Sequence, residues 1–159
     1  MREAVLLIGV GNEYRSDDAV GLLVAREFAR RNLPDVAIVE STGEGASLLE
    51  AWKGADRVVI VDAVSSGAAP GMVHRIIPSR EKWSGGPTPR SSHAFGVAEA
   101  IETARVLLRL PPSLTIVGIE GSNFAFGTLL SPPVAAGFPS LLRTVEDDLL
   151  ISGGKTNDG

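Results

Sequence analysis

The sequence predicts an α/β protein: a three-layer sandwich in which a mixed, mostly parallel, five-stranded twisted sheet carries helices on both faces. Short apolar runs rich in β-branched residues alternate along the chain with longer amphipathic segments, which is typical of this class. The chain has 159 residues, a length that suits one core, and 44% of them are hydrophobic against 21% charged. We therefore expect a single domain over residues 1–151 and a disordered tail over residues 152–159.

Five segments have the composition of strands. The runs at 4–10 and 56–63 are apolar almost throughout, as expected for strands buried on both faces of a parallel sheet. The connection after 56–63 is too short for a helical crossover, so we expect that strand and the next one to pair antiparallel. The predicted strands are residues 4–10, 36–40, 56–63, 72–77 and 113–120.

Four segments have the composition of helices. In the clearest of them the apolar residues recur at helical spacing and form one stripe. Ser16 or Asp17 can cap the first helix, which ends at Asn32 and Pro34. Pro139 is expected to interrupt the last helix early. The predicted helices are residues 18–31, 46–52, 93–110 and 133–151.

Bulk composition excludes several functional classes. The net charge is −4, which provides no basic surface for nucleic acid or an anionic membrane. No cysteine is present, which excludes disulfides and thiolate chemistry and fits a cytoplasmic protein. No apolar stretch approaches the roughly 20 residues that span a bilayer.

The segment GVGNEY at residues 9–14 has the two leading glycines of a dinucleotide-binding turn. Tyr14 stands where the third glycine of that motif belongs. Asp17 and Asp18 follow at the start of the helix, where their charge would repel a pyrophosphate. The segment is better interpreted as a tight turn that carries acidic side chains.

Two further polar residues lie at the ends of predicted elements. Asp62 ends a buried strand, and if that strand is the parallel neighbour of 4–10, it approaches Asp17 and Asp18 at one edge of the sheet. Alternatively, Asp62 only caps the turn that follows. His93 opens a helix, whose dipole favours a neutral imidazole with a free lone pair; the alternative is a surface histidine. His74 lies within a strand and is given no role.

Together, two carboxylates and one imidazole at a single sheet edge suit a borderline divalent cation such as nickel, zinc, manganese or iron. Three protein ligands also leave a coordination position open for a substrate group.

Several segments, in this order, resemble the hydrogenase maturation protease family, whose members process the large subunit of nickel–iron hydrogenases. The resemblance covers roughly residues 3–150, and the match of several motifs is far more specific than any one alone. The matching segments are GVGNEYRSDDAVG (9–21), VIVDAVSSGAAPG (59–71), SSHAFG (91–96), VGIEG (117–121) and LSPPV (130–134).

The resemblance implies an aspartic-type, nickel-dependent endopeptidase that removes a C-terminal extension from the large-subunit precursor, once, after nickel insertion. It implies that Asp18, Asp62 and His93 form the metal-binding and catalytic cluster. Nickel already held by the precursor would be the recognition element, so no permanently bound metal is expected. The expected partner is this precursor, with no nucleic acid or membrane, and the protease is expected to be a monomer.

Two departures from the family pattern affect the site. Many relatives have Glu where this chain has Asp18, whose side chain is one methylene shorter. Relatives often carry Asp-Gly-Gly-Thr after the second strand, whereas this chain has ESTGEG at 40–45. Thr42 and Gly43 keep the character of that turn and are expected to contact substrate. The Gly- and Pro-rich loop 78–91 is interpreted as a mobile flap over the substrate tail.

Other functions remain open from the residues alone. One is a metal-dependent aminopeptidase, or another small hydrolase that uses Ser91 or Ser92 beside His93. Another is a non-catalytic metal- or protein-binding module on the same fold, because a fold does not specify a function.

Overall fold

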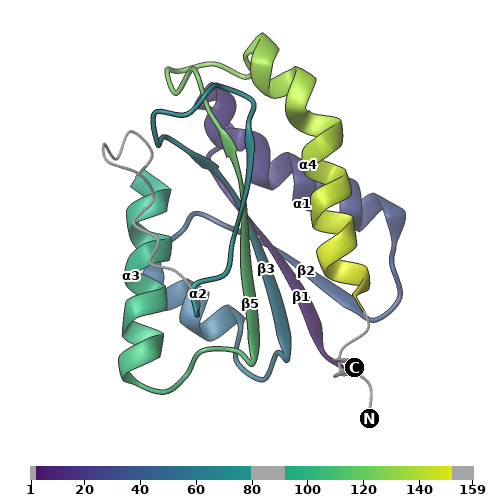
Figure 1. The fold of residues 1–159 in the computed structure, drawn as a ribbon, viewed down its shortest axis with the longest axis vertical. Coiled ribbons are helices and arrows are strands. Elements are labelled where there is room, and N and C mark those ends of the chain that lie inside the picture. The colour runs from purple at the N-terminus through teal and green to yellow at the C-terminus, as the bar shows by residue number, and fades with distance from the viewer. Residues whose placement is uncertain (1–2, 80–91, 152–159) are drawn as a thin grey trace, which may run out of the picture.

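The computed structural model describes residues 3–79 and 92–151, with the backbone alone for 92–95 (Figure 1). The predicted tail 152–159, and most of the predicted flap, namely residues 80–91, lie outside the described residues. The elements are β1 (Val5–Val10), a 3-10 turn η1 (Ser16–Ala19), α1 (Val20–Arg31), β2 (Val36–Ser41), α2 (Gly45–Ala51), β3 (Arg57–Val64), β4 (Val73–Ile76), α3 (Ser92–Val106), β5 (Ser113–Glu120) and α4 (Pro132–Leu150).

The described strands form one five-stranded mixed sheet in the order β2-β1-β3-β5-β4. The β1–β2, β1–β3 and β3–β5 pairs are parallel, and only β4 runs antiparallel, against β5. The predicted direct pairing of β3 with β4 is therefore wrong, because β5 lies between them. The connection between β3 and β4 is long enough to cross one strand, and β5 supplies that strand later in the chain.

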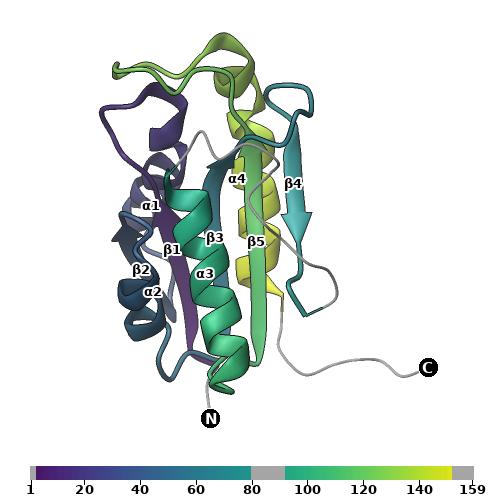
Figure 2. The ribbon, with the colours of Figure 1, turned by 90° about the vertical axis from the view of Figure 1, so that its left-hand side faces the viewer.

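Helices cover both faces of the sheet, which confirms the predicted three-layer sandwich (Figure 2). Strand residues alternate between two cores. The core beneath α2 and α3 contains Leu6, Ile8, Val58, Ile60, Leu114 and Ile116. The core beneath α1 and α4 contains Leu7, Val59, Val61, Val117 and Ile119.

Helix boundaries follow local signals with one exception. Asn32 adopts the left-handed conformation with a φ of 50° and ends α1 where it was predicted to end. Pro139 does not interrupt α4, contrary to prediction. The proline is exposed, and Val134 and Leu141 are buried on either side of it, so packing holds the helix together despite the missing N–H. No helix in the described part of the chain is long and apolar enough to cross a membrane.

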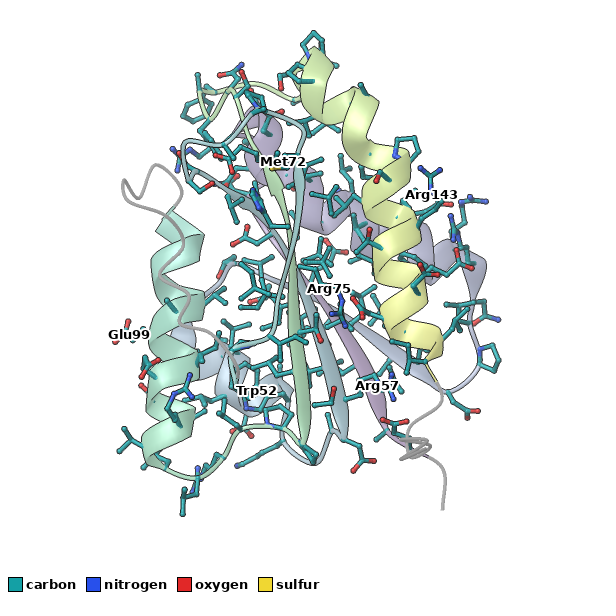
Figure 3. The ribbon with its side chains drawn as sticks, in the orientation of Figure 1. Trp52, Arg57, Met72, Arg75, Glu99 and Arg143 are labelled. Atoms are coloured by element: carbon teal, nitrogen blue, oxygen red, sulfur yellow. The ribbon has the colours of Figure 1, made fainter. Side chains whose placement is uncertain are left out.

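An ion-pair network ties α4 to the sheet on the face opposite α3 (Figure 3). Arg75 of β4 donates to both carboxylate oxygens of Asp148, at 2.6 and 3.0 Å. This hydrogen bonding raises the pKa of the Arg75 guanidinium. Arg57 of β3 donates to the backbone oxygen of Asp148 at 3.2 Å and to Glu3 at 3.0 Å. The network stabilises the fold without involving the predicted site residues.

Candidate functional site

Asp18 lies in the 3-10 turn that joins β1 to α1, and its side chain is fully buried. The backbone oxygen of Asp18 accepts a hydrogen bond from Asn12 N at 3.1 Å, which folds the turn back onto the end of β1. Gly21 brings α1 against the sheet: a Cβ there would lie 2.2 Å from Val10 O and 2.4 Å from Val61 O. The absence of a side chain at Gly21, in the first turn of α1, thus permits close packing of helix on sheet.

Asp17, next to Asp18 in the sequence, has a different setting. Its Oδ2 accepts hydrogen bonds from Ser122 N, Asn123 N and Ser131 Oγ at 2.7 to 2.8 Å, and its Oδ1 accepts one from Ser131 N at 2.7 Å. These contacts hold the loop 121–131, which follows β5, against the turn after β1. One buried carboxylate thereby satisfies three backbone amides that belong to no helix or strand.

The predicted helix cap at Ser16 or Asp17 is wrong, because neither side chain makes a capping hydrogen bond. Ser16 Oγ donates instead to Ala125 O at 2.9 Å, in the same loop that Asp17 holds. Both side chains therefore connect the turn to a distant loop. The sequence shows that Asp17 and Asp18 are adjacent, but it did not predict that their side chains have different structural roles.

Asp62 lies in β3 and is also fully buried. Gly9 of β1 pairs with Val61, so Asp62 lies one residue further along β3, beside the end of β1. The 3-10 turn that carries Asp18 contacts β3. The structure therefore brings both aspartates to the carboxyl ends of neighbouring parallel strands, where the sequence placed them.

Strand alternation places Asp62 on the same sheet face as Ile60, beneath α2 and α3. His93 is the second residue of α3, and the structure describes its backbone but not its side chain. Gly96 fixes where this helix starts: a Cβ there would lie 2.0 Å from Gly43 O, so the first turns of α3 lie against the turn after β2. The three predicted ligands thus come from elements that meet at one end of the sheet.

Ser91 and the side chain of Ser92 fall outside the described part of the structure. Among the residues whose side chains are described, no three histidine, aspartate or glutamate side chains form a metal-binding group. That search does not include His93, so metal binding by Asp18, Asp62 and His93 stays a prediction.

A groove of about 450 Å³ lies between the turn after β1 and the end of β2. It is called the β2 groove here, and it is lined by Gly11, Asn12, Glu13, Tyr14, Leu22, Arg26, Glu40, Ser41 and Thr42. Arg26 donates to Glu40 at 2.9 Å and lies 3.4 Å from Glu13, and the hydrogen bond to Glu40 raises the Arg26 pKa. Gly43, next to Thr42, has a φ of 90°, as expected for a turn of this kind.

A further buried carboxylate, that of Glu120, was not recognised from the sequence. It ends β5 and accepts hydrogen bonds from Ser66 N, Ser66 Oγ and Gly67 N at 2.7 to 3.0 Å. His74 Nε2 lies 3.1 Å from Glu120 Oε2, so the histidine that had no assigned role lies against this carboxylate. Glu120 thus holds the turn after β3 much as Asp17 holds the loop after β5. The only sequence signal was a charged residue ending an apolar strand.

Comparison with known proteins places this geometry in a family. The family model described as hydrogenase maturation protease matches residues 22–148. The Escherichia coli hydrogenase 2 maturation protease is 31% identical over 152 residues, covering 94% of this chain and 92% of the relative. The hydrogenase expression/formation protein HupD of Bradyrhizobium diazoefficiens is 31% identical over 133 residues, covering 82% of this chain and 69% of the relative.

A solved structure agrees with the sequence relatives. The hydrogenase maturating endopeptidase HybD from E. coli superposes with a TM-score of 0.78 at 28% identity, covering 91% of this chain and 90% of that one. Family model, curated relatives and solved structure therefore confirm the resemblance drawn from the sequence motifs. The chain belongs to the hydrogenase maturation protease family and is a peptidase of the endopeptidase type.

Proposed function

We propose that this protein removes the C-terminal extension of a nickel–iron hydrogenase large-subunit precursor after nickel has been inserted. The observation that carries the proposal is the placement of two fully buried aspartates, Asp18 and Asp62, at the ends of neighbouring parallel strands. They lie at the end of the sheet where α3 begins, and His93 is the second residue of that helix. Carboxylate oxygens and an imidazole nitrogen at one edge suit a borderline divalent ion.

In this proposal, nickel is part of the substrate. The precursor presents the ion with coordination positions still open, and Asp18, Asp62 and His93 bind it there. When the hydrogenase site closes around the metal, those positions are no longer available. The protease can therefore bind the exposed nickel of the loaded precursor but not the enclosed nickel of the mature subunit, so cleavage follows metal loading by selective binding.

The hydrolytic step uses the same residues. Either Asp18 or Asp62 takes a proton from the attacking water as general base, or nickel in the substrate polarises the scissile carbonyl. Thr42 and Gly43, at the end of β2, contact the extension as it enters. Thr42 lines the β2 groove, whose size and position beside the turn after β1 suit an extended peptide.

We place the reaction in the cytoplasm and assign it to a monomer.

The direct test compares nickel-loaded with nickel-free precursor, incubated with the purified protein. We expect cleavage of the loaded form only. Asp62→Asn and His93→Ala should each abolish cleavage while the melting temperature stays close to that of the wild type. The matched control is Glu99→Gln on the exposed side of α3, which should leave cleavage unchanged (Figure 3).

Several outcomes would contradict the proposal. Equal cleavage of both precursor forms would remove nickel as the recognition element. A large loss of stability in Asp62→Asn or His93→Ala would indicate structural roles instead. Release of single residues from peptide N-termini would favour an aminopeptidase, and intact loaded precursor would favour a non-catalytic binding module.

A further inference from the structure

Three large apolar side chains are exposed together at the carboxyl end of the sheet. Tyr14 is 60% exposed, Phe126 is 91% exposed and Leu129 is 81% exposed. Tyr14 belongs to the turn after β1, and the other two belong to the loop 121–131. Scattered exposed apolar residues are ordinary, but neighbouring ones mark an interaction site. These three residues are called the apolar platform below.

The backbone brings Tyr14 and Phe126 of the platform side by side. Arg15 and Gly127 form a parallel bridge, and Gly127 N donates to Tyr14 O at 2.9 Å. The residues that precede the bridge partners are Tyr14 and Phe126, so the two aromatic residues are neighbours across it. Leu129 follows two residues after Gly127. Tyr14 and Phe126 thus lie together although they are more than a hundred residues apart in the chain, and Leu129 belongs to the same loop as Phe126.

The loop that carries the platform is anchored on its inner side. Phe124 and Leu130 pack against the core beneath α1 and α4, whereas Phe126 and Leu129 between them point outward. Ser16 N donates to Gly127 O at 2.9 Å, and the four hydrogen bonds to Asp17 hold both ends of the loop. A surface held in this way loses little conformational entropy on binding.

The platform is continuous with the candidate site. Asp17, which holds the loop, is adjacent in sequence to Asp18. Tyr14 belongs to the platform and also lines the β2 groove. A substrate that occupies the β2 groove therefore contacts Tyr14 of the platform. The groove suits an extended peptide, whereas side chains that project from a fixed loop suit a folded apolar surface.

We propose that the apolar platform docks the folded body of the hydrogenase precursor through an exposed apolar patch, while the C-terminal extension enters the candidate site. This inference rests on the proposed function and adds a contact surface outside the Asp18, Asp62 and His93 cluster. Docking of the body would align the extension with the site. It also requires a protein substrate rather than a free peptide.

The test measures binding of Phe126→Ser and Leu129→Ser to nickel-loaded precursor. Each substitution should weaken binding by about tenfold or more, as truncation of a central apolar contact does, and cleavage at saturating precursor should be retained. The matched control is Val106→Ser, which should change nothing, because Val106 is 80% exposed and is the last residue of α3. That end of α3 lies at the opposite end of the sheet from the loop 121–131 (Figure 1). A precursor truncated to lack its extension should show the same loss of affinity with each variant.

The alternatives give different results. A loss seen only with the full-length precursor would overturn docking of the body and assign the platform to the extension. If Phe126→Ser or Leu129→Ser changed the sedimentation of the protease without precursor, the apolar platform would instead be a contact with a second copy of this chain. Unchanged affinity in both variants, with normal wild-type cleavage, would overturn the platform and leave the proposed function intact. Absence of wild-type cleavage would overturn the proposed function itself.

Discussion

Ser131 contacts Asp17 with both of its donors: the hydroxyl donates to Oδ2 and the backbone N–H donates to Oδ1, each at 2.7 Å. This paired contact ties the residue before α4 to the turn that carries Asp18. The two adjacent acids are therefore distinct. Asp17 organises the loop around the site, while Asp18 lies where substrate nickel is proposed to bind.

Asp17→Asn should lower the free energy of unfolding by about 2–4 kcal/mol, because charge-assisted hydrogen bonds are lost and the new amide NH₂ faces donors. Urea denaturation followed by circular dichroism measures this. Asp147→Asn, an exposed position on α4, is the matched control and should leave the free energy of unfolding nearly unchanged. Equal losses in the two variants would contradict the anchoring role of Asp17.

Gly21→Ala should prevent folding or lower stability by more than about 3 kcal/mol, because the new Cβ would overlap backbone rather than a movable side chain. Val10 O at 2.2 Å and Val61 O at 2.4 Å are the atoms it would meet. Gly45→Ala is the control, since its Cβ would lie 3.5 Å from Gly96 O, an ordinary contact. Thermal unfolding of both variants is the measurement, and similar melting temperatures would refute the packing argument.

Arg75→Ala should lower the free energy of unfolding by about 1–3 kcal/mol, because it removes the hydrogen bonds to the buried Asp148 carboxylate. Precursor cleavage per folded molecule should not change, since this network lies on the sheet face opposite Asp62. Arg30→Ala, which removes an exposed pair with Glu27, should leave the free energy of unfolding nearly unchanged. Loss of cleavage by folded Arg75→Ala would connect the network to the site.

Metal removal should affect the substrate and not the protease. Treating the precursor with a chelator that strips its nickel should abolish cleavage, and adding nickel back should restore it. Treating the protease alone with chelator, followed by dialysis, should leave cleavage of loaded precursor unchanged, because the ion is proposed to arrive with the substrate. Loss of activity in the treated protease would indicate a metal that the protein holds permanently.

Local patterns predicted most of the fold. Apolar runs located all five described strands, and residues 113–120 were predicted with the bounds that β5 has. Two predictions were wrong, the pairing of β3 with β4 and the break in α4, because each depends on contacts with residues outside the segment itself. The connection after β3 suggested a hairpin, yet β5 occupies the position beside β3. Pro139 suggested a break, yet packing on both sides keeps α4 continuous.

By itself, the sequence determined that acids follow two buried strands and that a histidine opens a helix, because these signals depend on residues next to one another. Only the tertiary structure decided that Asp17 organises the loop 121–131, because the partners of Asp17 are 105 to 114 positions away. The contact between His74 and Glu120 likewise could not be predicted from the sequence. Such hydrogen bonds depend on strand order and close packing, which a local pattern of residues does not encode.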